Sequence, residues 1–376
     1  MSEYQYYEWQ TINRPLTNAE QREVNGLSSH MDTVTSTQAV VTYSWGDFKH
    51  DPTQVLLKYF DAFLYDSNFG TRRLMFRLPR ALVDMEAIDT YCLEDWITLE
   101  EHGKYFVLEI TANDDDNNYE WIETDGTLGQ LTVLREQILQ GDYRMLYLIW
   151  LKAMEADPDI DEDELGPPVP AGLKNLNAGL QAFAEFFEIS PHLIAAAAAS
   201  SKKAESTPEL DLESAIPKLT RAEADSYLRQ IVRGEPGAVL LLKKHLMTLN
   251  GQNPSTTSPA KHTVAEILQQ AEKIEQDEQR KAHEEAERKR IQRLEKLATQ
   301  EEAAWVKVET LLNEKKAAAY DEATKLLVEL KELAIFKKQI DEYQEHFQYI
   351  HMKYGKSVAL TDRFRRAGLF KKDTVR

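Results

Sequence analysis

The stretch "EQDEQRKAHEEAERKRIQRLEKLA", residues 275–298, decides how this chain is organised. More than half of its residues are charged, the two signs are interleaved, and it contains neither Gly nor Pro. Acidic residues precede basic ones by four positions at Asp277–Lys281, Glu284–Arg288 and Glu285–Lys289. Each such pair stabilises a helix by about 0.2–0.5 kcal/mol. The stretch therefore predicts a solvent-exposed helix.

Apolar residues on both sides of this stretch follow helical spacing but leave a gap within it. The 94 residues from Lys261 to Tyr354 contain no Gly or Pro, and residues 263–316 as one helix would measure about 80 Å. A strong coiled coil needs large apolar residues at both seam positions over several heptads, whereas only Ala282 and Ala286 continue the seam between 275 and 290. The pattern predicts an interrupted coiled coil, a self-supporting rod with packing contacts at each end. The seam residues are Val264, Ile267, Ala271 and Ile274 before the gap and Ile291, Leu294, Leu297, Ala298, Trp305, Val308, Leu311 and Leu312 after it.

Two polar segments divide the chain. "SSKKAESTPELDLES" (200–214) and "NGQNPSTTSPAK" (250–261) have the Pro, Ser, Thr and Asn content of linkers. They predict an acidic domain over 1–200, a helical hairpin over 216–249, and a region over 262–370 that holds the long charged helix, a C-terminal helical hairpin and a basic tail.

The first 200 residues predict an α+β domain, a small antiparallel sheet with helices, because they offer too few strands for a parallel α/β sheet. Residues 51–66 have helical apolar spacing, with Asp51 as cap ahead of Pro52. Residues 72–79 alternate as in a strand with one wet face, and residues 96–110 indicate a hairpin around Gly103. Further helices are expected over 127–154, with a break near Gly141–Asp142, and over 172–189.

The second half predicts an all-α region. Thr220 and Glu223 form a capping-box pattern at the start of a helix that runs to about Arg233, followed by a Gly-Glu-Pro-Gly turn and a second helix. Residues 320–354 hold two amphipathic runs with a break expected near 336–338. They are similar to one helical hairpin of tetratricopeptide type. Because such repeats need three or more units to bury a core, we expect this hairpin to fold back on the long helix or to bind another molecule.

Charge and cysteine content limit the partners and the compartment. The net charge of −18 is uneven: residues 1–200 carry 34 acidic and 13 basic side chains. This acidic half would repel phosphates, which disfavours nucleic acid there. Cys92 is the only cysteine, which fits a reducing compartment. The first residues have no signal-peptide pattern, and the longest apolar run, 193–199, is too short to cross a bilayer. We expect a soluble, cytoplasmic protein with no membrane contact.

An acidic segment resembles a calcium loop. In "DDDNNYEWIETD" (114–125), five oxygen-bearing side chains fall at positions 1, 3, 5, 7 and 12 of an EF-hand-like register. Tyr119 stands where the sharp turn needs Gly, and the last residue is a short Asp, so a solvated acidic loop is the favoured interpretation. The metal candidates are Asp114, Asp116, Asn118, Glu120 and Asp125. The acidic run 155–170 is interpreted as a solvated connector.

Two basic clusters are candidate anion contacts. The last 26 residues hold eight basic and two acidic groups, and this tail could contact nucleic acid or the acidic front of another copy. In the front half, internal ion pairs are favoured over phosphate contact for the arginine cluster, and a packed strand is favoured over a base-stacking platform for Tyr4, Tyr6, Tyr7 and Trp9. The tail candidates are Arg363, Arg365, Arg366, Lys371 and Lys372; the front cluster is Arg72, Arg73, Arg77 and Arg80.

Some segments resemble known bacterial families. Residues 3–21, 43–52 and 59–79 resemble a family of uncharacterised bacterial proteins, a resemblance that implies no activity. Residues 219–236 and 320–369 look like helical segments near the C-termini of bacterial SWIM zinc-finger proteins. That resemblance implies a shared docking module. The zinc motif itself needs several Cys and a His, so with one Cys in this chain zinc binding is not implied.

We find no catalytic motif: no Walker loop, dinucleotide glycine pattern, nucleophile elbow or H-E-x-x-H occurs. The leading hypothesis is therefore a non-enzymatic interaction or scaffold protein without a cofactor, with recognition by the front domain and assembly through the helical back end. A homo-oligomer is an open possibility. One alternative is an accessory subunit that contacts nucleic acid through the basic tail. Another is an enzyme whose site in the front domain follows no motif, which a deep polar pocket with a shifted carboxylate would favour.

Overall fold

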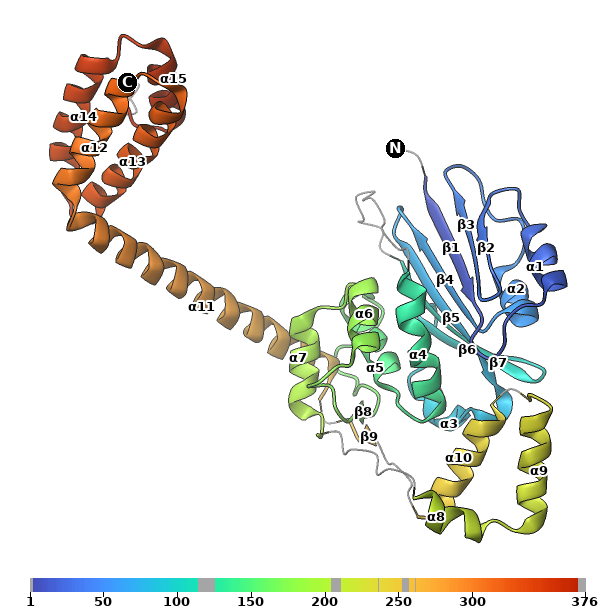
Figure 1. Cartoon of the computed structure of the whole chain (residues 1–376). Helices are drawn as coiled ribbons and strands as arrows, with labels where there is room; N and C mark the ends of the chain where they lie inside the picture. Colours follow the sequence, from blue (N-terminus) through green and yellow to red (C-terminus); the bar gives the residue numbers. More distant parts are fainter. Residues whose placement is uncertain are drawn as a thin grey trace. The chain divides into compact units, whose positions relative to one another are not determined.

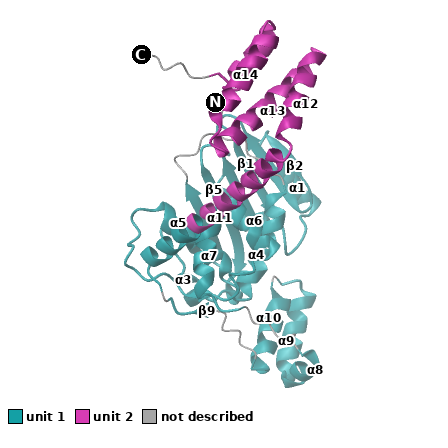
Figure 2. Cartoon of the chain, turned by 90° about the vertical axis from the view of Figure 1, so that its left-hand side faces the viewer, with its two compact units in different colours: residues 1–275 teal, residues 276–376 magenta. Residues whose placement is uncertain are grey.

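The computed structural model describes residues 3–113, 126–203, 211–235, 237–251, 257–260 and 262–370 (Figure 1). The chain divides into two compact units, unit 1 (residues 1–275) and unit 2 (residues 276–376), which Figure 2 colours separately. Unit 1 contains an antiparallel sheet with helices, and unit 2 is all-helical in its described part. The predicted fold class is confirmed.

Unit 1 is built on a seven-stranded sheet in which every neighbouring pair of strands is antiparallel. The strand order is β2-β3-β1-β4-β5-β7-β6, so the first strand of the chain lies near the centre. A separate two-stranded ribbon pairs β8 with β9. The strands are β1 (Gln5–Gln10), β2 (Met31–Val34), β3 (Gln38–Tyr43), β4 (Ala62–Ser67), β5 (Thr71–Pro79), β6 (Ile97–His102), β7 (Tyr105–Asn113), β8 (Val169–Pro170) and β9 (Thr257–Ser258).

Both faces of the central strands are covered. One face packs under α4, α5, α6 and α7 in the largest apolar core, and the other packs with α2 around an aromatic cluster. The alternation in 72–79 puts Met75 on the predicted wet face with Arg73 and Arg77, but Met75 is completely buried in the second core. The prediction of one wet face was wrong because α2 covers it. The helices before the first linker are α1 (Asn18–Asn25), α2 (Pro52–Tyr59), η1 (Arg80–Leu82), α3 (Met85–Asp89), α4 (Thr127–Leu139), α5 (Arg144–Ala156), α6 (Ala178–Phe186) and α7 (Pro191–Ser200).

The local signals in 51–66 predicted the start of helix α2 correctly but not its end. Asp51 caps α2 by accepting from the Thr53 amide, with Pro52 in the first turn. The helix ends at Tyr59, and residues 62–67 form β4 although their apolar spacing continues the helical period. All six residues of β4 are buried, because β4 pairs with β1 on one side and β5 on the other. Strand pairing on both edges outweighs the local period.

The N-terminal aromatic residues form a core strand. Tyr6, Tyr7 and Trp9 of β1 are buried, and Tyr7 packs against Tyr65 with ring centroids 4.7 Å apart. Their rings are therefore committed to the interior, which excludes the base-stacking platform for these three residues.

A helical hairpin follows the first linker. The Thr220–Glu223 capping box is formed as predicted, and the second helix follows a turn with two left-handed glycines, Gly234 and Gly237. Gly237 lies so close to η1 that a Cβ there would meet Leu82 Cδ1 at 2.4 Å. Glycine is thus required where the hairpin approaches the sheet domain. The elements are α8 (Leu212–Ala215), η2 (Ile216–Lys218), α9 (Arg221–Val232) and α10 (Ala238–Leu249).

The long helix α11 (Val264–Ala298) begins inside unit 1. Val264, Ile267 and Ala271 are buried in its main core. The backbone amides of Val264 and Ala265 donate to the carbonyls of Glu164 and Glu162, at 3.1 and 2.9 Å. The acidic run 155–170 therefore supplies acceptors, and nearby negative charge, at the positive N-terminal end of this helix. It is an anchor as well as a connector.

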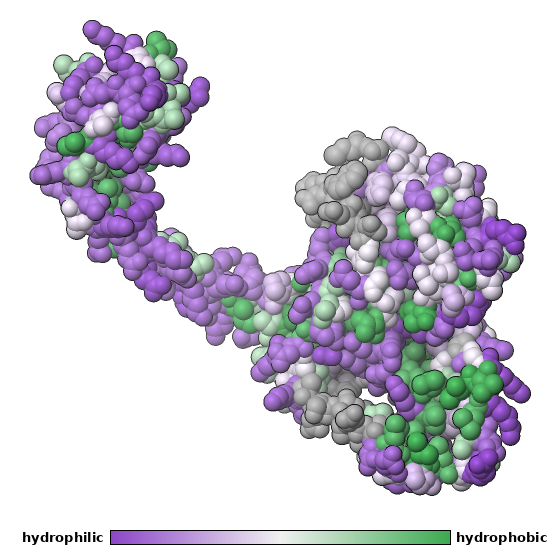
Figure 3. All heavy atoms as spheres, viewed as in Figure 1, coloured by the Kyte–Doolittle hydropathy of each residue, from purple (hydrophilic) through white to green (hydrophobic). Residues whose placement is uncertain are grey.

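The middle of α11 is exposed, as its charge pattern predicts. Between 275 and 290 every residue is exposed or partly exposed, and hydrophilic residues dominate the visible side of this part of α11 (Figure 3). Lys289 pairs with Glu285 at 2.8 Å, one of the predicted spacings. Burial resumes at Leu294. Residues 263–316 are not one helix, however, because α11 ends at Ala298.

The four helices that follow the end of α11 pack around one core in unit 2. These helices bury Val308, Leu327, Phe347 and Phe364, among others. The α13 helix packs against α12 and covers its apolar face. The predicted break near 336–338 is present, with Lys338 in the left-handed region (φ 58°). The helices are α12 (Glu301–Glu314), α13 (Ala317–Phe336), α14 (Ile340–Tyr354) and α15 (Val358–Arg366).

The hairpin α13–α14 also folds back on the end of α11, as expected. Arg290 Nε contacts Glu332 at 2.5 Å, Arg293 pairs with the same carboxylate, and Leu297 packs against the unit 2 core. Of the two arrangements expected for this hairpin, the structure shows the first. Beside the unit 2 core, a surface between α12 and α14 stays open to solvent.

Candidate functional site

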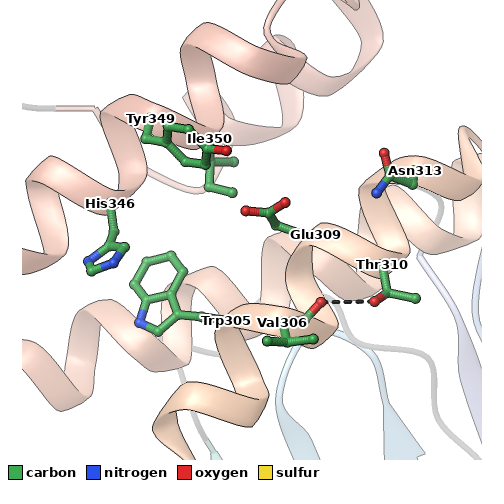
Figure 4. A pocket seen from close by; sticks show the side chains of 8 residues that line it. All are labelled: Trp305, Val306, Glu309, Thr310, Asn313, His346, Tyr349 and Ile350. Atoms are coloured by element: carbon green, nitrogen blue, oxygen red, sulfur yellow. Dashed lines mark hydrogen bonds between the residues drawn. The ribbon is translucent and has the colours of Figure 1, made fainter.

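The candidate site is a groove of about 650 Å³ between α12 and α14, which we call the α12–α14 groove (Figure 4). Helical spacing places its residues: on each helix, positions three or four apart share a face. Two of its apolar side chains, Val306 and Tyr349, are 66% and 53% exposed, so the groove presents apolar surface to solvent. It is lined by Trp305, Val306, Glu309, Thr310 and Asn313 of α12 and by His346, Tyr349 and Ile350 of α14.

Aromatic rings close one end of the groove. The Trp305 indole stacks on the His346 ring, with centroids 5.0 Å apart and planes 26° apart. It also meets Tyr343 at 5.6 Å, and Tyr343 is anchored in the core, where its hydroxyl donates to the Leu327 carbonyl. Trp305 is therefore held from two sides, which makes it a rigid wall.

An ion pair lies farther along the groove, one turn of α12 beyond Trp305. Lys353 Nζ lies 2.6 Å from Glu309 Oε2 and above the rings of Tyr349 and Tyr354. The Glu309 carboxylate and the Tyr349 hydroxyl raise the pKa of Lys353, so its charge is fixed over the physiological range. The Tyr354 hydroxyl donates to Asn313 Oδ1 at 3.2 Å. The polar groups at this end are already oriented before any ligand arrives.

This arrangement favours binding over catalysis. The Thr310 hydroxyl donates to the Val306 carbonyl one turn earlier (Figure 4), so its proton is committed to its own helix. Glu309 is committed to Lys353. The groove instead offers an apolar strip between a rigid aromatic wall and a fixed ion pair, a combination typical of a protein-binding surface.

Sequence reasoning named Trp305 only as a seam residue and missed the groove. A signal was available on α14: Tyr349 and Met352 lie off the face formed by Ile340, Tyr343, Phe347 and Ile350. They are 53% and 82% exposed. Apolar residues on the polar face of an amphipathic helix are the pattern that marks such a surface.

The basic tail is only partly described. Arg363 Nε pairs with Asp321 Oδ1 at 2.6 Å, and Arg365 pairs with Asp362 at 2.8 Å. Arg366 lines a second hollow of about 720 Å³ together with Asp321, Asp362 and Lys325. Lys371 and Lys372 lie outside the described residues. Since carboxylates neutralise two of the three described arginines, the structure gives the nucleic-acid alternative no added support, and it stays a prediction.

The calcium-loop candidates Asp114, Asp116, Asn118, Glu120 and Asp125 also lie outside the described residues. Within the described ranges, no group of three or more His, Cys, Asp and Glu side chains is placed to hold a metal ion. The front arginines are engaged internally, as favoured: Arg72 pairs with Glu188, Arg73 with Glu109, Arg77 with Asp61 and Arg80 with Glu101.

One front carboxylate has a strongly shifted pKa. Burial raises the pKa of Asp66 to about 6, against the opposing effect of the Arg72 guanidinium, 3.6 Å from its Oδ1. Asp66 is 3% exposed, and Arg72 continues to Glu188 on the α6–α7 loop at 2.7 Å. The buried Asp66 carboxylate and the exposed Glu188 carboxylate are therefore linked through Arg72, which connects the β4–β5 hairpin to the helical layer. Both hollows above lie in unit 2, and the enzyme alternative stays a prediction.

Asp66→Asn is expected to remove a pH dependence of unit 1 stability. Because the pKa of Asp66 is higher in the folded state than its ordinary value of 3.8, the folded state binds the proton more tightly. The contribution of Asp66 to the stability of unit 1 therefore falls as pH rises from about 4 to about 6 and stays constant above that. The unfolding free energy of the variant minus that of the wild type should therefore be about 1–3 kcal/mol larger at pH 8 than at pH 4. Urea unfolding at both pH values measures this gain; an equal difference at both would contradict it.

Trp45 of unit 1 is an exposed aromatic residue next to an anchored stretch of backbone. Trp45 is 72% exposed. The adjacent backbone is fixed because Gln5 Nε2 donates to the Gly46 carbonyl at 3.1 Å and to Asp47 Oδ1 at 2.9 Å. A large aromatic held in solvent by a rigid loop is a typical recognition contact. Its sequence signal is the polar, glycine-containing turn around it, "YSWGDF".

Scans against protein-family models, curated proteins and solved structures each gave no match. The resemblances drawn from the sequence stay predictions. Among the helices that the described residues form, none combines the length and the apolar character needed to span a membrane.

Proposed function

We propose that this is a cytoplasmic, non-enzymatic interaction protein in which unit 1 recognises one partner and unit 2 binds another through the α12–α14 groove. The observation that carries the proposal is the groove itself: exposed Val306 and Tyr349 between the Trp305–His346 wall and the Glu309–Lys353 ion pair. Exposed apolar residues with an oriented polar rim are the features by which protein-binding surfaces differ from ordinary surface.

The groove favours a helical partner segment. It runs between two helices, and α12 has 14 residues, about 21 Å. An amphipathic helix of three or four turns fits that length and presents apolar anchors at spacings of three and four. One anchor would lie between Val306 and Tyr349, against Trp305. A polar residue of the partner would meet the Glu309–Lys353 pair.

The division of the chain supports two separable contacts. The exposed, charged middle of α11 lies between the core that buries Val264 and the core that buries Val308. The middle of α11 is stabilised by ion pairs within the helix and does not need to pack into a core of its own. Each unit can therefore present its own binding surface. Trp45 is the most exposed large aromatic residue of unit 1 within the described part of the chain and is our candidate for its contact.

Photo-crosslinking from the groove tests the proposal. A photoreactive amino acid replaces Val306 in the full chain in living cells. The matched control replaces Val328, an apolar residue of α13 that is 40% exposed and outside the groove. A specific protein adduct is expected from position 306 and not from position 328.

The captured protein is then purified and its affinity measured. Tyr349→Ala should raise its Kd by about 10–100-fold, as for a central aromatic contact, and Val328→Ala should leave it unchanged. If both positions give the same adducts, or if Tyr349→Ala binds as tightly as the wild type, the groove is not the binding site.

A further inference from the structure

The second hollow of unit 2, which we call the α13–α15 hollow, has a volume of about 720 Å³ and a polar lining. Helical spacing places its residues, since positions three or four apart share a face. Three basic and two acidic side chains face it, so the lining has a net charge of +1. These charged residues are Asp321 and Lys325 of α13 and Asp362, Arg363 and Arg366 of α15.

The two carboxylates of the hollow are already neutralised. Asp321 Oδ1 lies 2.6 Å from Arg363 Nε. Asp362 Oδ1 lies 2.8 Å from Arg365 Nη1, and Arg365 is not part of the lining. Neither carboxylate therefore depends on the two basic residues of the hollow that remain.

These two residues, Lys325 and Arg366, are available to a ligand. Their side chains have no hydrogen-bond or ion-pair partner among the described residues. Lys325 acts on Asp321 only at longer range, where it adds to the larger effect of Arg363 in lowering the pKa of that carboxyl. An arginine can hold a carboxylate through two parallel hydrogen bonds, and a lysine binds one as a point charge. The hollow therefore presents two cations to an incoming carboxylate.

The acidic run 155–170 of unit 1 offers the complementary groups. It contains seven acidic residues and no basic one. Its backbone is held in place because the carbonyls of Glu162 and Glu164 accept from the first amides of α11. The side chains of Asp159 and Asp163 are exposed, and no described residue pairs with their carboxylates. The run thus presents unpaired carboxylates from a fixed backbone.

We infer that the α13–α15 hollow binds the acidic run of a second copy of this chain. Lys325 and Arg366 of one copy pair with carboxylates of the other, Asp159 and Asp163 among them. Opposite charges on the two surfaces steer the copies together and fix which surfaces meet. The contact uses neither the α12–α14 groove nor Trp45, so it goes beyond the proposed function.

Other occupants fit the hollow less well. Ala359 and Ala367 are the only apolar residues of its lining, so a segment with large apolar anchors finds no matching surface. Nucleic acid presents a continuous row of phosphates, which Asp321 and Asp362 in the lining would repel. A short acidic peptide segment places single carboxylates between these two aspartates and meets the cations.

Zero-length crosslinking tests the inference and separates contacts between copies from contacts within one. A carbodiimide joins a lysine amine to a carboxylate that it touches. In an equal mixture of unlabelled and isotope-labelled full chains, we expect mixed-label peptides that link Lys325 to the acidic run. Lys356 is the matched control, because it lies outside the hollow and has no partner among the described residues. The inference is overturned if Lys325 gives no such links, gives them only within one label, or gives no more of them than Lys356.

Charge reversal on each side tests the pairing itself. One variant carries Lys325→Glu with Arg366→Glu, and the other carries Asp159→Lys with Asp163→Lys. At low salt the wild type should associate weakly, with a Kd of about 100 μM. Each variant alone should have a Kd about 10-fold higher or more, because like charges then face each other, and an equal mixture of the two should recover association.

Sedimentation velocity of the full chains measures these constants, and circular dichroism checks that each variant is folded. Lys356→Glu, the matched charge change outside the hollow, should leave the Kd unchanged. A wild type that stays monomeric at ~500 μM, above the expected Kd, would overturn the inference. Two variants that each associate like the wild type, or a mixture that stays dissociated, would overturn it equally.

Discussion

Replacing Asp61 with Ala is expected to lower the free energy of unfolding of unit 1 by about 3–5 kcal/mol. Asp61 is 1% exposed. It pairs with Arg77 at 2.9 Å and with Arg135 at 3.7 Å, and it accepts from the backbone amides of Ile12 and Asn13 at 2.7 and 2.8 Å. Without the carboxylate, the Arg77 guanidinium and the two backbone amides lose a hydrogen-bond acceptor, and the buried Arg135 guanidinium loses its ion-pair partner.

The electrostatics agree with that expectation. Burial alone would raise the pKa of Asp61, but Arg135, Arg77 and the two amides together hold it below its ordinary value. Burial also lowers the pKa of Arg135, whose Nη2 has no hydrogen-bond partner. Because the pKa of Asp61 is depressed in the folded state, its contribution is present at neutral pH and is lost as pH falls below about 4.

Chemical denaturation of the full chain measures the loss. Glu101→Ala is the matched control, since Glu101 pairs with Arg80 at the surface of the same sheet, and exposed pairs contribute about 0–1 kcal/mol. If Asp61→Ala lowers the free energy of unfolding no more than Glu101→Ala does, the buried ion pairs of Asp61 do not stabilise unit 1.

Replacing Phe364 with Ala is expected to destabilise unit 2 by about 3–5 kcal/mol. Phe364 of α15 is completely buried, and its ring packs against Phe347 of α14 with centroids 5.3 Å apart. Its removal leaves a cavity where α15 closes the core formed by α12, α13 and α14. Val358→Ala, on the exposed side of the same helix, is the control and should be nearly neutral. Equal stability of the two variants would show that α15 is not part of the core.

The sequence signals that succeeded were local ones. Asp51 before Pro52, and Thr220 three residues before Glu223, satisfy orphan amides wherever the chain places them, so they mark helix starts reliably. The exposed middle of α11 was predictable for the same reason, because its pairs are four residues apart. The lone cysteine and the gap in the apolar seam were likewise visible in the sequence.

The failures involve partners far apart in the chain. The helical period continues through residues 62–66, but β1 and β5 turn this segment into a strand. The break at 299–300 has no Gly or Pro, and beyond it α12 buries its apolar face in a core shared with α13, α14 and α15. The α12–α14 groove depends on Trp305 meeting His346, two residues 41 positions apart. No local pattern encodes such contacts.

The central claim is that the two units are stabilised separately and are joined by a helix that needs neither core. Hydrogen exchange of the full chain measures this most directly, with the wild type compared with Asp61→Ala and Phe364→Ala. We predict that Asp61→Ala accelerates exchange in the sheet and leaves exchange in α12–α14 unchanged. Phe364→Ala should accelerate exchange in α12–α14 and leave the sheet unchanged. Neither variant should change exchange of the amides of 278–288. A single substitution that accelerates exchange equally in the sheet, in 278–288 and in α12–α14 would contradict it.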